Sequence, residues 1–286
     1  MRQPVLKPSQ SELKQKYENL LTLLRSLGDS AIAYSGGVDS TFLLAAAKLA
    51  PVENLIALTM KRPYFADWEL EEAVRFAEDI GAEHRVIEIP VDETIRNNPY
   101  DRCYRCKTFT FNAFWEVLNE IKYDTLMDGT ITDDTGEYRP GLQAVREQNV
   151  RSPLRETGFT KDEIRELCRA MDLPVWDKPS NTCLITRIPY NTHVSDEDFR
   201  QIELAELFLI REGFDLVRVR KHGDIARIEV DPERISELAQ PDIMNRIVPY
   251  LKSLGFTHVS IDMVGYKTGS LDVDILKNVH NGNEQR

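Results

Sequence analysis

The chain has 286 residues, of which 42% are hydrophobic and 29% are charged, and its formal net charge is −11. This length exceeds the roughly 100–200 residues of a single domain, so we expect two domains of an ordinary globular protein. A negative net charge disfavours binding to many nucleic-acid phosphates, which favours a small substrate over nucleic acid. No apolar run reaches the ~20 residues of a membrane span and no apolar signal segment opens the chain, so the sequence predicts a cytoplasmic protein without a membrane anchor.

The four cysteines are Cys103, Cys106, Cys168 and Cys183. The cytosol keeps thiols reduced, so a disulfide framework is not expected there. Metal binding and catalysis are therefore the roles to consider.

The first third of the chain alternates helical and strand patterns. The expected elements, in order, are a helix at 11–27, a strand at 31–34, a helix at 40–49, a strand at 55–60, a helix at 68–80 and a strand at 84–89. This βαβαβ alternation predicts an α/β fold with a doubly wound parallel sheet. Ligands of such sheets bind at the carboxyl ends of the strands.

The next segment, 92–107, reads as a polar insertion that holds Cys103 and Cys106, and helical spacing resumes over 109–121. A strand at 125–127 then ends in Asp128-Gly129-Thr130, followed by an acidic loop with Asp133 and Asp134. Carboxylates at a strand end are expected to contact Mg²⁺ or a nucleotide, although a solvated acidic loop has the same composition.

A helix over 160–171 has a capping box, in which Thr160 caps the start and Glu163 completes the box. Cys168 lies on its apolar side, so we expect a core position. After residue 192 the pattern becomes helix 195–211, strands 216–220 and 225–230, helix 232–254 and strand 258–264. We therefore predict a first domain over 1–190 and a smaller α+β domain over 191–286.

The string Ser35-Gly36-Gly37-Val38-Asp39-Ser40 joins a strand to a helix. Its glycines let the backbone approach a ligand, so that successive N–H groups and a helix N-terminus face an anion. It lacks the lysine of a Walker loop. It resembles the PP-loop of ATP pyrophosphatases, which cleave ATP between the α and β phosphates and adenylate a substrate.

Cys183 lies between Lys178 and Arg187, whose charges would favour the reactive thiolate; a buried packing cysteine is the alternative. Cys103 and Cys106 have the spacing of a redox pair, half a zinc site or part of a cluster site. A closed zinc site needs four ligands, and a core Cys168 would not supply the fourth.

Further strings follow along the chain: Cys103-Tyr104-Arg105-Cys106-Lys107, Asp128-Gly129-Thr130, Asp133-Asp134, Tyr138-Arg139-Pro140-Gly141, Ser152-Pro153-Leu154, Lys161, Ile164-Arg165 and the segment from Lys178-Pro179 to Tyr190. In order and spacing they resemble the LarE family of ATP-dependent sulfur transferases, which build the nickel-pincer nucleotide of lactate racemase. The similarity covers about residues 12–265.

The resemblance implies adenylation of a carboxylate of pyridinium-3,5-dicarboxylate mononucleotide, followed by replacement of oxygen with sulfur. One branch of the family sacrifices the sulfur of the cysteine matching Cys183. The other holds a 4Fe-4S cluster, here on Cys103, Cys106 and Cys183, whose open iron carries an extra sulfide. Having all three cysteines, this chain resembles the second branch, which requires a sulfide donor.

The resemblance also implies further site residues. Lys107, Asp39 and Cys183 are expected at the reaction centre, with ATP and Mg²⁺ bound by Ser35, Gly36, Gly37, Asp39, Ser40, Met60, Asp128, Gly129, Asp134 and Arg139. In the second domain, Arg218 and Arg220 alternate on one strand face and Glu206 lies on the preceding helix. This set matches an anion site for the substrate phosphate, and exposed strand charges are the alternative. A homo-oligomer, in the family a hexamer, is expected.

Asn191 stands where the family has glycine after Pro-Tyr. Asparagine accepts the left-handed backbone conformation that this glycine implies.

Three other functions are compatible with parts of the sequence. A tRNA thiolase also couples a PP-loop to a cluster, but it predicts a basic surface. An amide-forming ligase has no use for the three cysteines. A nucleotide-binding module without catalysis would bind ATP and release no pyrophosphate.

Overall fold

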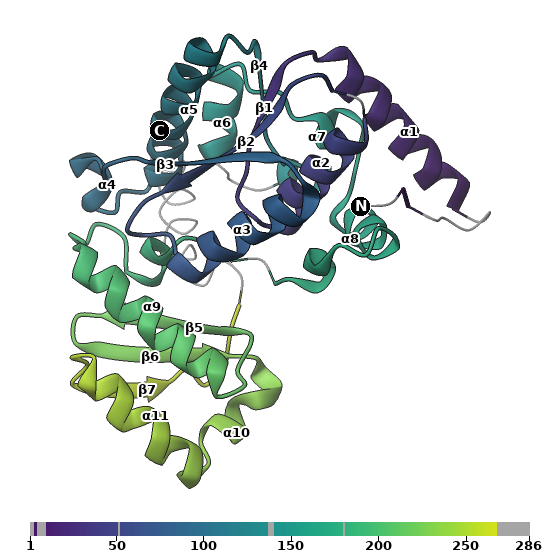
Figure 1. Ribbon diagram of the computed structural model, residues 1–286. Helices are drawn as coiled ribbons and strands as arrows, with labels where there is room; N and C mark the ends of the chain where they lie inside the picture. The colour runs from purple at the N-terminus through teal and green to yellow at the C-terminus, as the bar shows by residue number, and fades with distance from the viewer. Residues whose placement is uncertain (1–2, 5–9, 51, 137–139, 180, 268–286) are drawn as a thin grey trace, which may run out of the picture. The chain divides into compact units, whose positions relative to one another are not determined.

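The computed structural model describes residues 3–4, 10–50, 52–136, 140–179 and 181–267 (Figure 1). The chain forms two compact units. The first comprises Met1–Pro90 and Asp101–Asn181, and the second comprises Val91–Tyr100 and Thr182–Arg286. The chain passes from one unit to the other after Pro90, after Tyr100 and after Asn181. The second of these boundaries lies just before Cys103 and the third just before Cys183.

The first unit is built on a parallel sheet of four strands in the order β3-β2-β1-β4. The strands are β1 (Ser30–Ala33), β2 (Leu55–Lys61), β3 (Glu83–Glu88) and β4 (Thr125–Met127). This confirms the predicted α/β class. The chain runs from β1 outward to β3 and then returns to β4 on the other side of β1. The point where the strand order reverses, between β1 and β4, is where such sheets bind ligands.

Helices pack on both faces of this sheet (Figure 1). One face carries α1 (Ser11–Ser26), α2 (Val38–Leu49), α3 (Asp67–Ile80) and α8 (Lys161–Ala170), and the other carries α5 (Arg102–Ile121) and α6 (Pro140–Glu147). Neighbouring residues of β1 point to opposite faces of the sheet: Ile32 packs in the hydrophobic core with α1, α2, α3 and α8, and Ala31 packs in the core with α5 and α6. This alternation follows from the two-residue period of a strand. The short helix α7 (Pro153–Glu156) and the 3₁₀ turns Thr132–Gly136 and Pro174–Asp177 complete the unit.

The predicted polar insertion over 92–107 is wrong in its second half, because α5 begins at Arg102. At the start of α5, Arg102 is buried and the side chains of residues 103–109 are half-buried or exposed. The next buried side chains are those of Thr110 and Phe111. The apolar spacing that would indicate a helix is therefore absent where Cys103 and Cys106 lie. The cysteines are on a helix, and not in a loop.

The second unit contains a three-stranded sheet in the order β5-β6-β7. Its elements are α4 (Glu93–Arg96), the 3₁₀ turn Leu184–Arg187, α9 (Asp196–Arg211), β5 (Val217–His222), β6 (Ile225–Val230), the 3₁₀ turn Pro232–Arg234, α10 (Ile235–Leu238), α11 (Pro241–Ser253) and β7 (His258–Ile261). β5 and β6 are antiparallel, and β6 and β7 are parallel. The predicted single helix over 232–254 is wrong. Gln240 adopts an extended conformation and Pro241 starts a new helix, because proline is favoured at a first helical position.

Residues 91–100 are held to the second unit by Asn98, a buried residue whose side-chain nitrogen donates to the carbonyl oxygens of Ile188 and Pro189 at 2.9 Å each. The backbone oxygen of Asn98 accepts from the N–H of Asn191 at 2.9 Å. Asn191 has φ 57°, which confirms the left-handed conformation expected there. Among the described residues, no helix has the length and apolar character needed to cross a membrane.

Candidate functional site

The loop from Ser35 to Ser40 connects the carboxyl end of β1 to α2. None of the described side chains caps α2, whose N-cap residue is Gly37, so the first N–H groups of the helix are available to an anion. The loop is held by its own serines, since Ser35 Oγ lies 3.1 Å from Ser40 Oγ and Ser40 Oγ donates to Gly37 O at 3.2 Å. The geometry is that of a preformed phosphate cradle.

Two glycines allow close backbone approaches at this cradle. Gly36 has φ +69°, and a Cβ there would lie 2.6 Å from the Cβ of Ala73. A Cβ on Gly129, in the loop after β4, would lie 3.0 Å from the backbone nitrogen of Ser40. The ends of β1 and β4 therefore meet at the first turn of α2.

A cavity of about 370 Å³ lies against the cradle, a volume within the roughly 300–1,000 Å³ of small-molecule sites. Of the residues predicted from the sequence, it is lined by Ser35, Gly37, Asp39, Ser40, Met60, Cys106, Lys107, Asp128, Gly129 and Asp134. Phe65, Leu70, Phe111 and Phe114 add apolar surface suited to a planar base. Gly36 shapes the loop behind the cavity, and Arg139 lies outside the described residues.

Asp39 points its carboxylate at Lys161, whose Nζ donates to the two oxygens at 2.7 and 2.6 Å. Burial raises the pKa of Asp39, and the nearby Asp134 raises it further, while Lys161 opposes both. Lys161 thus supplies the positive charge that a divalent cation would otherwise bring to this carboxylate.

Asp128 is buried and accepts hydrogen bonds from Ser152 Oγ at 2.7 Å and from the backbone and hydroxyl of Thr130. Its carboxylate also lies 3.8 Å from Lys107 Nζ. Asp39 and Asp134 also have protein donors, Lys161 and the N–H of Ile131, but they are half-buried whereas Asp128 is buried. Asp39 and Asp134 are therefore the better candidates for Mg²⁺. The described residues contain no cluster of three or more His, Cys, Asp or Glu side chains arranged for a metal. Mg²⁺ commonly takes one or two carboxylates together with substrate phosphates, and this pair fits that requirement.

Cys103 and Cys106 lie three residues apart in the first turns of α5, on one side of the helix. Cys103 is exposed and Cys106 is half-buried. The Sγ of Cys106 is 3.2 Å from the hydroxyl of Tyr64 and 3.7 Å from Nη1 of Arg62. Burial, followed by the neighbouring Cys106, raises the pKa of Tyr64 far above its ordinary value, so this hydroxyl is a neutral hydrogen-bonding group.

Cys183 precedes the 3₁₀ turn Leu184–Arg187 and is half-buried. Its carbonyl oxygen accepts from the N–H and the hydroxyl of Thr186 at 3.0 and 2.8 Å, which fixes the backbone at this cysteine. The two cations near it in sequence are paired with carboxylates, Lys178 with Glu72 and Arg187 with Glu206. Cys168 is fully buried in the core, as predicted, and burial raises the pKa of its thiol to about 12.

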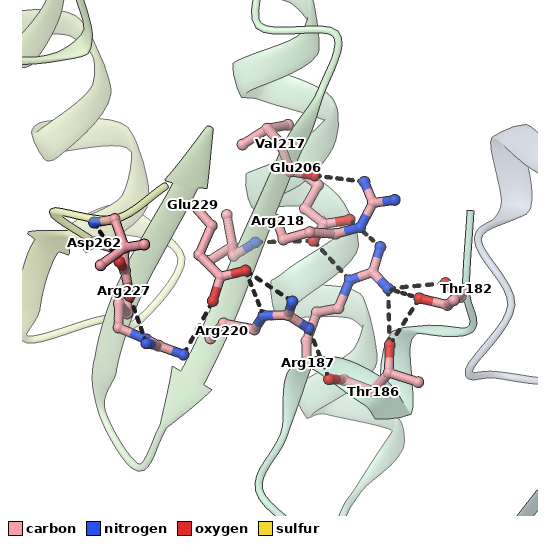
Figure 2. A network of polar contacts seen from close by, with 12 residues as sticks. Thr182, Thr186, Arg187, Glu206, Val217, Arg218, Arg220, Arg227, Glu229 and Asp262 are labelled. Carbon is pink, nitrogen blue, oxygen red and sulfur yellow. Dashed lines mark hydrogen bonds and ion pairs between the residues drawn. The ribbon is translucent and has the colours of Figure 1, made fainter. Parts of the chain in front are cut away.

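The predicted anion residues of the second unit belong to a buried network (Figure 2). Arg187 pairs with Glu206 through two hydrogen bonds of 2.8 and 2.9 Å, and Arg220 pairs with Glu229 through bonds of 3.0 and 2.7 Å. The expectation of exposed strand charges as an alternative is wrong, because Arg218 and Arg220 are only 3% and 6% exposed. On β5 the two arginines alternate with Val217 and Val219 of the hydrophobic core, so both faces of the strand are buried.

Arg218 stacks on the ring of Tyr266, with its guanidinium carbon 5.1 Å from the ring centroid. Burial and the charge of Arg187 lower the pKa of Arg218. A second negative charge would therefore stabilise Arg218, as expected for an anion site.

Sequence reasoning missed the pairing of Lys161 with Asp39 and the contacts of Arg62 and Tyr64 with Cys106. Arg62 directly follows the carboxyl end of β2. Attention to every strand end of the predicted sheet, and not only to those of β1 and β4, would have found it.

The parallel sheet, the phosphate cradle and its cavity define an enzyme of the PP-loop class. No protein-family model matches the sequence. The pyridinium-3,5-bisthiocarboxylic acid mononucleotide synthase of Lactiplantibacillus plantarum is 34% identical over 269 residues, which cover 93% of this chain and 96% of that protein. The chain belongs to the family of this synthase, LarE, and is a sulfurtransferase.

Two other proteins are also similar to the chain. An uncharacterised protein of Synechocystis, slr1717, is 36% identical over 262 residues, covering 91% of this chain and 98% of that protein. The tRNA-specific 2-thiouridylase MnmA of Leptospira interrogans is 25% identical over 237 residues, covering 66% of this chain and 61% of that enzyme. The second similarity is distant and concerns the PP-loop superfamily.

Proposed function

We propose that this enzyme adenylates a carboxylate of pyridinium-3,5-dicarboxylate mononucleotide with ATP and then replaces a carboxylate oxygen with sulfur, in nickel-pincer nucleotide biosynthesis. The observation that carries the proposal is that Cys106 and Lys107 line the same cavity as the phosphate loop. A cysteine proposed for sulfur delivery and the loop proposed for adenylation therefore line one cavity. The substrate is taken from the name of the L. plantarum relative.

The reaction has two steps. A carboxylate oxygen attacks the α-phosphorus of ATP and pyrophosphate leaves, which gives an acyl adenylate. A sulfur nucleophile then attacks the acyl carbon, and the carbon–oxygen bond breaks to release AMP. The thiocarboxylate remains, and two such cycles would give a bisthiocarboxylate.

Residues of the first unit perform the activation in this proposal. The N–H groups at the start of α2 and the hydroxyls of Ser35 and Ser40 hold the departing pyrophosphate. Asp39 and Asp134 are the residues that would hold Mg²⁺, which would supply positive charge to the phosphates. Lys107, whose Nζ lies 3.8 Å from Asp128, is positioned by that buried carboxylate to contact the α-phosphate.

Sulfur delivery is assigned to Cys103, Cys106 and Cys183 as ligands of a 4Fe-4S cluster. Their partial exposure suits metal binding, whereas the buried Cys168 does not. The cluster, when bound, supplies a sulfide on its open iron. The alternative within the same enzyme is that Cys183 gives up its own sulfur.

The second unit is assigned the phosphate of the mononucleotide, held by Arg218 and Arg220 with Glu206 as an orienting carboxylate. The proposal also includes a sulfide donor and a homo-oligomer, and light scattering of the purified protein measures the latter.

Pyrophosphate release and product mass test the function. With sulfide-loaded enzyme, ATP and the dicarboxylate mononucleotide should give pyrophosphate, AMP and a thiocarboxylate, and omission of the mononucleotide should stop all three. Asp39→Asn should abolish both steps, while Cys183→Ala should keep pyrophosphate release and lose sulfur insertion. Sulfur insertion without AMP would contradict the proposal.

Unmodified tRNA is the comparison substrate, because the MnmA relatives make a tRNA thiolase the second candidate. Pyrophosphate release that depends on tRNA and not on the mononucleotide would favour that function.

Iron and acid-labile sulfide, measured after anaerobic purification, test the cluster. Both should be present in the unmodified enzyme and lost in Cys103→Ala, Cys106→Ala and Cys183→Ala. Iron absent from every preparation, with Cys183 losing the mass of H₂S after one turnover, would support sacrifice of Cys183 instead.

A further inference from the structure

A buried cation, for which the described residues provide no carboxylate partner, lies beside the cysteine pair. Arg62 is 2% exposed. Within the part of the chain that the structure describes, its Nη1 donates to the hydroxyl of Tyr64 and lies 3.7 Å from Cys106 Sγ. Its Nε and Nη2 atoms are buried and have no hydrogen-bond partner in that same part of the chain. Arg187 and Arg220 are similarly buried, but each makes two hydrogen bonds to a glutamate.

A buried guanidinium is unfavourable unless a negative group compensates its charge. The hydroxyl of Tyr64 accepts from Arg62 and lies 3.2 Å from Cys106 Sγ, so it joins the cation to the sulfur. Among the described polar partners of Arg62, the sulfur of Cys106 is the one suited to carry negative charge. Tyr64 is 1% exposed and Arg62 lies over its ring at 5.7 Å, so the group is packed in place.

We propose that Arg62 is a positioning residue for the sulfur of Cys106, supplying the positive charge and, with Tyr64, the hydrogen-bond donors that hold this sulfur in the wall of the ATP cavity. This inference rests on the proposed function, which gives Cys106 a role in sulfur chemistry. It applies to Cys106 as a free thiolate and as a cluster ligand, because both forms place negative charge on the same atom.

This arrangement makes the two cysteines of the pair unequal. Cys106 faces Arg62 and Tyr64, whereas Cys103 is exposed. Cys103 therefore serves as an internal reference for any measurement on Cys106. Hydrogen bonds and positive charge at a ligating sulfur also favour the reduced cluster, so Arg62 would raise its reduction potential.

Alkylation of metal-free protein tests the inference without any reaction being catalysed. The rates at which iodoacetamide modifies Cys103 and Cys106 are measured at neutral pH by peptide mass spectrometry. Arg62→Gln should slow modification of Cys106 by about tenfold or more, because loss of the guanidinium removes the positive charge and hydrogen bond that hold the attacking sulfur. Arg62→Lys should retain most of the rate, Tyr64→Phe should lie between, and Cys103 should be unchanged.

An unchanged or faster Cys106 in Arg62→Gln, with Cys103 unaltered and the circular dichroism of the folded protein retained, would overturn the inference. If Arg62→Gln does not fold, Arg62→Lys and Tyr64→Phe decide: Cys106 slowed in Tyr64→Phe and largely preserved in Arg62→Lys supports the inference, and any other order opposes it.

The iron-loaded enzyme separates this inference from the proposed function. Arg62→Gln, or Tyr64→Phe where the first variant does not fold, should have a more negative reduction potential than the unmodified enzyme at equal iron content. An equal potential would overturn the inference and leave the cluster intact. Iron missing from the unmodified enzyme would remove the cluster from the proposed function, and the alkylation rates would then decide the role of Arg62.

Discussion

The phosphate loop and the arginine network are two candidate anion sites built in opposite ways. The loop offers backbone N–H groups at the start of α2 that no described side chain caps. The network offers arginine side chains, of which Arg187 and Arg220 are already bound to Glu206 and Glu229. The first site is ready for an anion, whereas the second is held in shape by its own carboxylates.

This difference determines how each site fails. A backbone site depends on glycines and on close approach of segments, so a single methyl group damages it. A site of paired side chains depends on charge balance, so loss of one partner leaves the other buried and uncompensated.

The largest expected effect is a loss of stability on removal of a charge from the buried arginine–glutamate network of the second unit. Glu229 is fully buried and receives Arg220 at 2.7 Å and Arg227 at 3.0 Å. Glu229→Gln should destabilise the second unit by about 3–5 kcal/mol, because the buried Arg220 loses its counter-charge, whereas the half-buried Arg227 keeps its pair with Asp262. Urea unfolding followed by circular dichroism measures this. The tryptophans, Trp68, Trp115 and Trp176, all lie in the first unit, so their fluorescence should follow a transition that stays in place.

The matched control is Glu237→Gln in the same unit. Glu237 pairs with Arg234 at 2.7 Å, but its side chain is 47% exposed. No measurable shift of the midpoint is expected. Equal shifts of the urea midpoint in Glu229→Gln and Glu237→Gln would show that burial of the ion pair does not cause the loss of stability.

The second effect is on the loop. Gly36→Ala places a Cβ 2.6 Å from that of Ala73 at φ +69°. The left-handed conformation alone costs about 1–2 kcal/mol, and the displaced loop should slow pyrophosphate release by about 100-fold. Gly28→Ala is the control, since Gly28 has φ +66° but no atom of the described residues lies within 4 Å of where its Cβ would stand. It should lose stability and keep activity; equal loss of activity in both would oppose the account.

The third effect concerns Asp39, the carboxylate of the phosphate loop, and its pair with Lys161. Lys161→Met removes the cation bonded to Asp39, which should cost about 1–3 kcal/mol. Mg²⁺ should then raise the melting temperature more in this variant than in the unmodified protein, because a cation that binds the folded state stabilises it. An equal response to Mg²⁺ in both proteins would argue against Asp39 as a ligand.

The smallest effect is a dependence on pH that both units share. Burial lowers the pKa of His84 in the first unit, and burial with the charges of Arg227 and Arg220 lowers that of His222 in the second. Each histidine binds a proton more readily in the unfolded chain, so stability should fall as pH drops below about 6.5. The loss by pH 5.5 is at most about 1.4 kcal/mol per histidine. His84→Gln and His222→Gln should each flatten the pH curve, which urea unfolding at a series of pH values measures.

Local patterns explain which parts of the molecule were predictable. The strand, glycine turn and helix around Ser35–Ser40 depend on neighbouring residues, as does the capping box of Thr160 and Glu163, which the structure contains. The parallel sheet followed from the same alternation. The helical position of Cys103 was hidden, because Arg102, a charged residue, is the buried side chain at the start of α5.

The network shows why the rest was not predictable. Arg220 is paired in the interior with Glu229 of the neighbouring strand β6, which lies opposite Arg218 in the register, and this pairing is not evident from the sequence. Arg62 likewise meets Cys106 across 44 residues of chain. Such contacts depend on tertiary packing and charge pairing, which no local spacing records.

The central claim is that the phosphate loop activates a carboxylate by adenylation, and oxygen transfer tests it most directly. The mononucleotide substrate is prepared with ¹⁸O in its carboxylates, and the AMP formed in the reaction is analysed by mass spectrometry. Adenylation followed by attack of sulfur at the acyl carbon predicts one ¹⁸O atom in the phosphate of AMP for each thiocarboxylate formed. Thiocarboxylate accompanied by unlabelled AMP, or by ¹⁸O in inorganic phosphate, would contradict the account.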